Sequence, residues 1–377
     1  MNPFPGACRK HSASGAGTAD ILAYKTNHLK GLIMETEMKD TVAIDWDELT
    51  FSVTPTRSMY IAECLEGGTW NSKGLVPYGD ITISPAACVI NYGQGLFEGM
   101  KAYRTAKDNV VLFRPIENAK RANSGCRRLC MPEVPEELFV DAIRSVVRDN
   151  IDYVPPADKG ALYLRPLVFG SGPVLGVKPA PSYTFLIYVS PVGPYFKEGL
   201  AGINLLVTED FHRAAQFGTG GVKAIGNYAG GMYPGSLAKA EGYSEIVYTD
   251  ARKEHFLEEV GAANFFLIKG DVLATPELDG SILPGITRKS ICEMAATEFG
   301  YTVEERQVAV EEIFEADEAF CSGTAAVITP ILSMTHRDRK MEFCGGEVGE
   351  KTMALYNGLN GIIREEREDP YGWIEVL

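Results

Sequence analysis

The stretch SPVGPYFKEG, residues 190–199, concentrates proline and glycine and separates two differently patterned parts of a 377-residue chain. Before it, short apolar runs such as VVLF and YTFLIYVS are broken by Gly and Pro, as is typical of strands. After it, the runs INLLV, EIVY, NFFLI and EAFCS alternate with helical segments. We therefore predict a mixed α/β (α+β) fold with a small domain over 46–189, a connector over 190–199 and a large domain over 200–377.

The charge of the chain excludes several classes of partner. The formal net charge of −14 repels nucleic-acid phosphates and anionic lipid, so we expect no nucleic-acid binding. The long uncharged runs, at 81–97 and 179–196, are interrupted by proline, glycine and polar residues. We therefore expect no membrane span.

The eight cysteines form no Cys-x-x-Cys pair, and a chain of this length needs no disulfide staples. We interpret them as reduced thiols of an intracellular protein. Cys126 and Cys130 are one helical turn apart, but no histidine lies near them in the sequence, so we predict no metal site.

Residues 1–45 form a predicted N-terminal extension. The first 34 residues contain a single acid, Asp20, and the small-residue stretch SASGAGTA. Such a segment suits either a disordered extension of a cytoplasmic protein or a mitochondrial or plastid presequence. We favour the disordered extension, because Arg9 and Lys10 are few basic residues for a presequence.

Two helices are marked by proline. Pro115 suits a first helical position, and Ala119, Ala122, Cys126 and Cys130 then fall on one face. The second follows the turn Pro284-Gly285, and its apolar face comprises Ile291, Met294, Ala295 and Phe299. Its first amides, at Ile286 and Thr287, suit an anion, although an ordinary helix start without a ligand is the commoner case.

The stretch GTGGVKAIGNYAGG, residues 218–231, places Lys223 among glycines and small apolar residues with no acidic neighbour. It is no Walker loop, because Val222 precedes the lysine and Ala224 follows it. One interpretation is an exposed lysine on a flexible loop. The other is a desolvated amine of lowered pKa that forms a Schiff base with pyridoxal phosphate.

An acid for the pyridine nitrogen of such a cofactor is available in FLEEVGAANFF, which contains Glu258 and Glu259. In an ordinary hairpin both would be solvated, and periodicity alone does not choose between them. The turn CSGTAA, residues 321–326, adds the hydroxyl of Thr324 but is weak on its own.

Several blocks, in this order and spacing, resemble the fold-type-IV pyridoxal phosphate enzymes: GGVKAIGNYA, LEEVGAANFF, LPGITRKS and GTAA. Further blocks narrow the resemblance to the branched-chain amino-acid aminotransferases: NYGQGLFEGMKAYR, FRPIENAKR, LYLRPLVFGSGPVLGV and SPVGPYF. The resemblance covers residues 45–377. It implies a two-domain fold with the cofactor at the domain interface, the large domain binding pyridoxal 5'-phosphate.

The resemblance also implies roles for single residues. Lys223 matches the catalytic lysine that forms the Schiff base, Tyr228 the partner of the phenolic oxygen, and Glu259, rather than Glu258, the partner of the pyridine nitrogen. Arg121 matches the phosphate-binding arginine, assisted by Ile286, Thr287 and Thr324.

For substrate, Tyr163 and Arg165 match the pair that recognises carboxylates, and Tyr92 and Phe97 match pocket-wall positions that hold the aliphatic side chain. Thr324 and Ala325 complete the set within one subunit. Leu175 and Val177 match a loop that closes the pocket of the neighbouring subunit, which implies a homodimer with shared sites.

The implied activity is reversible transfer of the amino group of L-leucine, L-isoleucine or L-valine to 2-oxoglutarate, giving glutamate. The alternatives are another enzyme of this fold type, such as a D-amino-acid aminotransferase or an aminodeoxychorismate lyase, or a non-catalytic phosphate-binding relative. The chain also departs from the family pattern. Ala262 replaces a pocket hydroxyl, and Ala326 and Thr329 stand where mammalian members have a redox Cys-x-x-Cys.

Overall fold

The computed structural model describes residues 44–65, 68–193, 201–252 and 254–377. They fall in the second of two compact units, Met1–Val42 and Ala43–Leu377. Almost all of the predicted N-terminal extension (1–45) and more than half of the predicted connector (190–199) lie outside the described residues. The division into domains at 46–189 and 200–377 stays a prediction.

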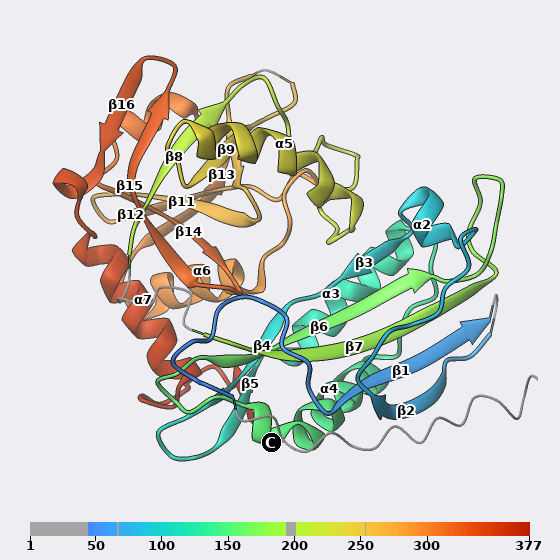
Figure 1. Cartoon of the computed structure of the whole chain (residues 1–377). Coiled ribbons are helices and arrows are strands. Elements are labelled where there is room, and N and C mark those ends of the chain that lie inside the picture. Colours follow the sequence, from blue (N-terminus) through green and yellow to red (C-terminus); the bar gives the residue numbers. More distant parts are fainter. Residues whose placement is uncertain (1–43, 66–67, 194–200, 253) are drawn as a thin grey trace, which may run out of the picture. The chain divides into compact units, whose positions relative to one another are not determined.

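In the described part of the chain, the first sheet has eight strands in the order β17-β5-β4-β6-β7-β1-β2, with β3 also paired to β6 (Figure 1). Its pairings are antiparallel. The strands, in chain order, are β1 (Ser58–Leu65), β2 (Asn71–Pro77), β3 (Gly95–Phe97), β4 (Met100–Arg104), β5 (Val110–Phe113), β6 (Ala161–Gly170), β7 (Ser182–Val192) and β17 (Ile374–Val376). The last strand of the chain therefore completes a sheet that the first strands began.

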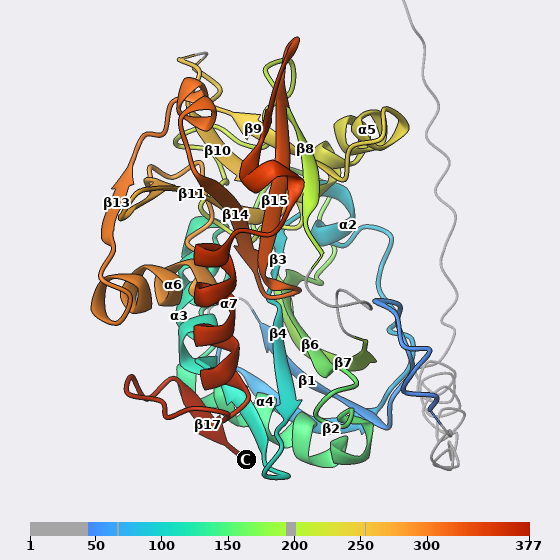
Figure 2. The same cartoon turned by 90° about the vertical axis from the view of Figure 1, so that its left-hand side faces the viewer.

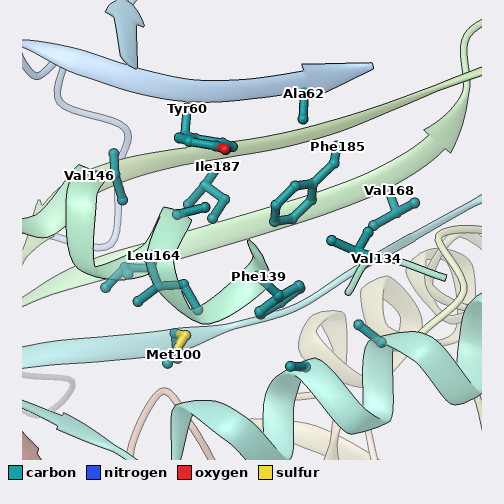
Figure 3. Close-up of a cluster of buried hydrophobic side chains, with 14 of the residues drawn as sticks. Tyr60, Ala62, Met100, Val134, Phe139, Val146, Leu164, Val168, Phe185 and Ile187 are labelled. Atoms are coloured by element: carbon teal, nitrogen blue, oxygen red, sulfur yellow. The ribbon is translucent and has the colours of Figure 1, made fainter. Parts of the chain in front are cut away.

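Two helices, α3 (Pro115–Arg128) and α4 (Glu136–Asp149), cover one face of this sheet. Phe139 of α4 stacks on Phe185 of β7, with the ring centroids 5.2 Å apart. Figure 3 shows this contact among Leu164, Val168 and Ile187, which point from the sheet toward the helices. Fully burying such side chains stabilises the fold by about 1.5–3 kcal/mol each.

The second sheet has nine strands within the described residues, in the order β10-β9-β8-β15-β14-β11-β12-β13, with β16 on β15. An additional pairing of β10 with β11 closes a ring of six of these strands. The strands are β8 (Ile203–Thr208), β9 (Glu245–Thr249), β10 (Leu257–Val260), β11 (Ala263–Lys269), β12 (Val272–Pro276), β13 (Thr302–Arg306), β14 (Glu318–Gly323), β15 (Val327–His336) and β16 (Arg339–Glu342).

Helices α6 (Ile286–Thr297) and α7 (Glu350–Ile363) pack against each other and against β14 of this sheet (Figure 2). Met294 and Leu355 are wholly buried there with Phe320. The same core includes Tyr103 and Val111 of the first sheet, so side chains of both sheets share it. The remaining helices in the described part of the chain are α2 (Cys88–Tyr92) and α5 (Gly226–Ala240), with short 3₁₀ turns η1 (Ile151–Tyr153), η2 (Val310–Phe314) and η3 (Phe343–Gly346).

The predicted helix starts are confirmed. Pro115 occupies the first turn of α3, and α6 begins at Ile286 directly after Pro284-Gly285. The predicted face of α3 is wrong at its end, because the helix stops at Arg128. Cys130 lies beyond it with φ +53° and is exposed. The predicted strand runs VVLF, YTFLIYVS, INLLV, EIVY, NFFLI and EAFCS are found in β5, β7, β8, β9, β11 and β14.

Two further observations concern the described residues only. No helix among them is long and apolar enough to cross a membrane. They contain no group of three or more His, Cys, Asp or Glu side chains that could hold a metal ion, and their seven cysteines are free thiols.

Candidate active site

The loop that carries Lys223 runs beside β3 of the first sheet. The amide of Phe97 donates to the Lys223 carbonyl at 3.1 Å, and the amide of Ile225 donates to the Gly95 carbonyl at 3.1 Å. Ala224 forms a β-bridge with Leu96 between these two bonds. Backbone pairing therefore fixes where the lysine side chain leaves the loop, and it places that side chain next to Phe97.

Close backbone packing requires a glycine at position 220 of this loop. A Cβ at Gly220 would collide with the Ser281 carbonyl, and the amide of Gly221 donates to the Gly280 carbonyl at 2.8 Å. Asn227, in the first turn of α5, donates from its amide nitrogen to the Val222 carbonyl at 2.9 Å. The loop is thus held on both sides before any ligand is considered.

The Lys223 amine lies in an apolar, aromatic setting. Its Nζ is 3.2 Å from the hydroxyl of Tyr228 and 4.7 Å from the ring centroid of Phe97. No ion pair found among the described residues includes this amine. Burial lowers the pKa of Lys223 to about 8, and the positive charge of Arg121 contributes to the shift.

Tyr228 and Phe97 pack edge to face, with their ring centroids 4.7 Å apart. Burial raises the pKa of Tyr228 to about 12, and the nearby carboxylate of Glu259 adds to the rise. The hydroxyl therefore stays protonated at neutral pH, and it is able to donate a hydrogen bond.

A row of side chains from β3, β4 and β6 borders the lysine. Phe97 is paired in register with Leu167, and Lys101 with Tyr163. Arg165, two residues along β6 from Tyr163, lies with its guanidinium 4.7 Å from the Phe97 ring centroid. Alternating strand residues share a face, so these groups project together.

Tyr163 and Arg165 contact each other directly. The Nη2 atom of Arg165 donates to the Tyr163 hydroxyl at 3.1 Å. Gly99 makes room for that hydroxyl, because a Cβ at this position would collide with it. The Nε atom of Arg165 is buried without a hydrogen-bond partner, so the guanidinium keeps a donor available for a ligand.

Glu259 is only 2% exposed, and its carboxylate forms an ion pair with Arg213. Asn264 donates to its Oε1 at 3.2 Å, and the amide of Leu283 donates to its Oε2 at 3.3 Å. Burial raises the pKa of Glu259, whereas Arg213 and the Leu283 amide oppose the rise.

Glu258 is also buried, so the alternative of two solvated carboxylates in an ordinary hairpin does not hold. Its Oε1 accepts a hydrogen bond of 2.6 Å from Ser281, whereas its Oε2 is buried without a partner. Burial raises the pKa of Glu258 to about 7. Adjacent strand residues point to opposite faces, so the two carboxylates face different surroundings.

The N-terminus of α6 lies next to Arg121. The Nη1 atom of Arg121 donates to the Pro284 carbonyl at 3.1 Å, just before the helix. A cavity of about 810 Å³ is lined by Arg121, Gly285 and Ile286, among other residues. Glu98 binds the same guanidinium through two bonds, of 2.9 Å to Nε and 2.6 Å to Nη2.

The other predicted phosphate ligands meet nearby. Ile286, Thr287 and Thr324 line one small cavity of about 30 Å³ together with Lys101. The Thr324 hydroxyl donates to the Gly99 carbonyl at 3.1 Å. The turn from CSGTAA therefore lies between the N-terminus of α6 and β4, although the sequence alone gave it little weight.

Tyr92, Leu175 and Val177 are grouped elsewhere. The hydroxyl of Tyr92, at the end of α2, donates to the Leu175 carbonyl. Leu175 is 92% exposed and Val177 is 87% exposed. Among the hydrogen bonds and ring contacts of the described residues, none joins Tyr92 to the group around Phe97. The assignment of Tyr92 and Phe97 to one pocket wall stays a prediction.

Sequence reasoning missed three residues of this site: Glu98, Arg213 and Lys101. Glu98 and Lys101 lie inside the quoted block NYGQGLFEGMKAYR, where strand alternation would have placed them on opposite faces. Arg213 carries no such signal, because it precedes Lys223 in a loop that no periodicity describes.

Comparisons with known proteins agree with this geometry. The family model "Amino-transferase class IV" matches residues 95–334. The chain is 49% identical over 342 residues to the chloroplastic branched-chain-amino-acid aminotransferase 5 of Arabidopsis thaliana, covering 91% of this chain and 82% of that protein. It is 44% identical over 332 residues to the methionine aminotransferase of the same plant, covering 88% of this chain and 92% of that one.

A solved structure is similar as well. The branched-chain amino acid aminotransferase of Escherichia coli superposes with a TM-score of 0.73 at 29% identity, over 85% of this chain and 99% of that chain. The chain belongs to the class IV amino-transferase family. The resemblance to fold-type-IV branched-chain aminotransferases that the motifs predicted is confirmed.

Proposed function

We propose that this chain is a pyridoxal phosphate-dependent aminotransferase that exchanges the amino group of L-leucine, L-isoleucine and L-valine with 2-oxoglutarate. The observation that carries the proposal is the Lys223 amine, which is buried against Phe97 and bonded to Tyr228 rather than to a carboxylate. With a pKa of about 8, such a lysine has a larger neutral fraction, with a free lone pair, near neutral pH than an ordinary lysine has.

The residues present fit pyridoxal phosphate. Arg121 and the first amides of α6 offer positive charge and donors to a phosphate. The buried carboxylate of Glu259 offers a negative partner to a protonated ring nitrogen. Gly285 lets the turn before the helix pack against Asn264, since a Cβ there would collide with the Asn264 side chain.

Each residue then has a chemical task. Lys223, in its neutral form, accepts the proton that leaves the Cα of the amino-acid substrate. In the reverse half-reaction it returns a proton to the Cα. Tyr228, held protonated by its raised pKa beside Lys223, would donate a hydrogen bond to the phenolic oxygen of the bound cofactor. The cofactor supplies an electron sink for the pair left on the substrate Cα.

Substrate binding is assigned to the row on the first sheet. Phe97 offers an apolar face to a branched side chain, while Tyr163 and Arg165 offer a hydroxyl and a free guanidinium donor to carboxylates. One site then accepts both leucine and glutamate, because apolar and cationic surfaces lie side by side. The similarity to a methionine aminotransferase makes methionine a second candidate substrate.

The active unit is proposed to be a homodimer. The turn that Tyr92 holds by a hydrogen bond exposes the apolar side chains of Leu175 and Val177. An exposed apolar surface of this kind is typical of a protein–protein contact. For location, two proposals stand, a cytoplasmic one and an organellar one. The name of the chloroplastic relative favours the organelle.

The test is covalent trapping of the cofactor. Borohydride reduction of the holoenzyme should label one peptide containing Lys223, and Lys223→Ala should lower kcat by about 10⁴-fold while the protein still binds the cofactor loosely. Label on Lys239 or another lysine would end this assignment. A panel of L- and D-amino acids with 2-oxoglutarate then ranks leucine, isoleucine, valine and methionine.

A further inference from the structure

Glu258 has no role in the scheme above, although it is nearly as deeply buried as its neighbour Glu259. The two residues are 5% and 2% exposed. Among the described residues, none forms a hydrogen bond with the buried Oε2 atom of Glu258. A carboxylate with one oxygen desolvated and unpaired is costly, whereas a neutral carboxyl group avoids most of that cost.

The hydroxyl of Ser281 lies between two carboxyl groups. Its Oγ is 2.6 Å from Oε1 of Glu258 and 2.7 Å from Oδ1 of Asp279. The Ser281 amide donates to the same Oδ1 at 2.9 Å. A hydroxyl carries a single hydrogen, so it donates to only one of the two carboxyl groups. At such short distances the other contact needs a hydrogen of its own, and a protonated carboxyl group provides one.

The surroundings favour this proton on Glu258. Burial raises the pKa of Glu258 to about 7, and the negative charges of Asp279 and Glu259 add to the rise. The hydrogen bond with Ser281 and the charge of Arg213 oppose it, but Arg213 forms its ion pair with Glu259. Asp279 is only half-buried and already accepts from the Ser281 amide, so a negative charge is better accommodated there.

The turn that contains Ser281 supports two parts of the candidate active site. The Ser281 carbonyl packs so closely against the lysine loop that a Cβ at Gly220 would collide with it. Two residues further along the turn, the Leu283 amide donates to Glu259 at 3.3 Å. A side chain that fixes Ser281 therefore fixes both the lysine loop and one hydrogen-bond donor to Glu259.

We propose that Glu258 is a positioning residue that works in its protonated form. It donates to the Ser281 hydroxyl, which in turn donates to Asp279, and so holds the turn of residues 279–283 against the lysine loop. The proton thus reverses the direction of the 2.6 Å hydrogen bond between Glu258 and Ser281. Loss of the proton leaves two carboxylates competing for one hydroxyl hydrogen, which loosens the turn. The effect on the cofactor rests on the proposed function, whereas the protonation does not.

Infrared spectroscopy of the holoenzyme detects the proton directly, because a protonated carboxyl group has a C=O stretch distinct from that of a carboxylate. This band should lose intensity as the pH rises through about 7, and Glu258→Gln should remove the titrating component. Glu254→Gln is the matched control, since Glu254 is exposed and paired with Arg252. Ser281→Ala should keep the band but move it to higher frequency, because the acid loses its hydrogen-bond acceptor.

The stability of the same holoenzymes gives a second measure. Folding raises the pKa of Glu258 from its ordinary value of 4.5 to about 7. Its contribution to stability is therefore complete below the lower value and is lost as the pH rises through the higher one. The midpoint of thermal unfolding of the wild type, relative to that of Glu258→Gln, should fall between about pH 5 and about pH 8. Glu254→Gln should follow the wild type.

Equilibrium dialysis with pyridoxal phosphate tests the positioning role. The dissociation constant of the wild type, divided by that of Glu258→Gln, should rise about three- to tenfold from about pH 6 to about pH 9, as expected for one weakened hydrogen bond. The ratio cancels the titration of Lys223, which both proteins share. A side chain that only fills space would give the same ratio at every pH.

A protonated-carboxyl band that Glu258→Gln leaves unchanged would overturn the inference. So would a ratio of dissociation constants that is independent of pH. If Glu258→Gln does not fold, Ser281→Ala decides, because an unshifted band would then show that Glu258 does not donate to Ser281. A wild type that shows the titrating band but transfers no amino group from leucine would overturn the proposed function and leave the protonation of Glu258 in place.

Discussion

Lys223 lies between two buried arginine–glutamate pairs that are built differently. In the first, Arg121 of α3 binds Glu98 through two hydrogen bonds, and the side chains are 10% and 1% exposed. In the second, Arg213 pairs with Glu259, and the side chains are 6% and 3% exposed. Both pairs act on the lysine, since Arg121 lowers its pKa whereas Glu98 and Glu259 raise it.

The difference lies in what else each arginine holds. Arg121 reaches the Pro284 carbonyl at the start of α6, beside a cavity. Arg213 instead donates to the Gly220 carbonyl at 3.0 Å and the Ser281 carbonyl at 2.7 Å, so it clamps the lysine loop. The two ion pairs therefore differ in their surroundings. Arg121 lies beside a cavity at the start of α6, whereas Arg213 holds the backbone carbonyls of Gly220 and Ser281.

Within the two pairs, the largest effect is expected at Glu259. Glu259→Gln should lower kcat by about 10²–10³-fold, because a neutral amide does not hold a protonated ring nitrogen. The neighbouring carboxylate is the matched control. Glu258→Gln should be mild in steady-state kinetics, since Glu258 faces Ser281 rather than Arg213. The reverse pattern would show that the two carboxylates have been assigned in the wrong order.

Substitution of the two arginines should affect cofactor affinity to different extents. Arg121→Met should weaken pyridoxal phosphate binding by about 10²-fold, as measured by equilibrium dialysis, because a phosphate contact is lost. Arg213→Met should change that affinity much less. Each substitution leaves a buried glutamate unpaired, at a cost of about 3–5 kcal/mol, so both should lower the midpoint of thermal unfolding. Equal losses of cofactor affinity would erase the distinction between the pairs.

The pKa of Lys223 reflects the electrostatic effects of both ion pairs. With a pKa of about 8, the amine is mostly protonated below that pH. The rate of cofactor capture by the apoenzyme should therefore rise by about tenfold per pH unit up to about pH 8 and then level off.

Substitutions in the two pairs should move the midpoint of this pH dependence in opposite directions. Glu259→Gln removes a negative charge and should lower it, whereas Arg121→Met should raise it. Lys101→Met should leave the midpoint in place if Lys223 alone is being titrated. A midpoint that neither Glu259→Gln nor Arg121→Met shifts would contradict the electrostatic coupling described above.

The smallest effect is expected outside both pairs, at the exposed turn of Leu175. Leu175→Ala should raise KM for branched substrates by a few-fold, with glutamate and cofactor absorbance unaffected, because area bookkeeping gives such burial a few kcal/mol at most. Analytical ultracentrifugation on the same variant and on the wild type reports the oligomeric state. A fully active monomer, or a KM change without substrate selectivity, would refute the shared site.

Much of the fold followed from local signals. Pro115 and Pro284 marked helix starts, and apolar runs marked strands, because these features act through the backbone within a few residues. The end of α3 did not follow, since nothing in the sequence marks the positive φ of Cys130. The predicted face of α6 likewise runs past the helix end, because Phe299 follows Thr297.

The site was predicted unevenly for a related reason. Lys223 stood out by its charge-free surroundings, but the choice between Glu258 and Glu259 needed the resemblance. Arg213 and Lys101 escaped notice because their partners, Glu259 and the Ala325 carbonyl, are distant in sequence and meet them only when the sheets are assembled. Pairings of that kind are properties of topology rather than of any local pattern.

The position of β17 has a consequence for the order in which the molecule is completed during synthesis. Ile374 pairs with Phe113, and Val376 with Val111, so β17 covers the edge of a strand that is synthesised much earlier. Until then β5 presents unpaired amides and carbonyls, which can pair with another chain. The nascent protein therefore exposes this edge while the second sheet is translated, and the edge closes only after residues 374–376 have emerged from the ribosome.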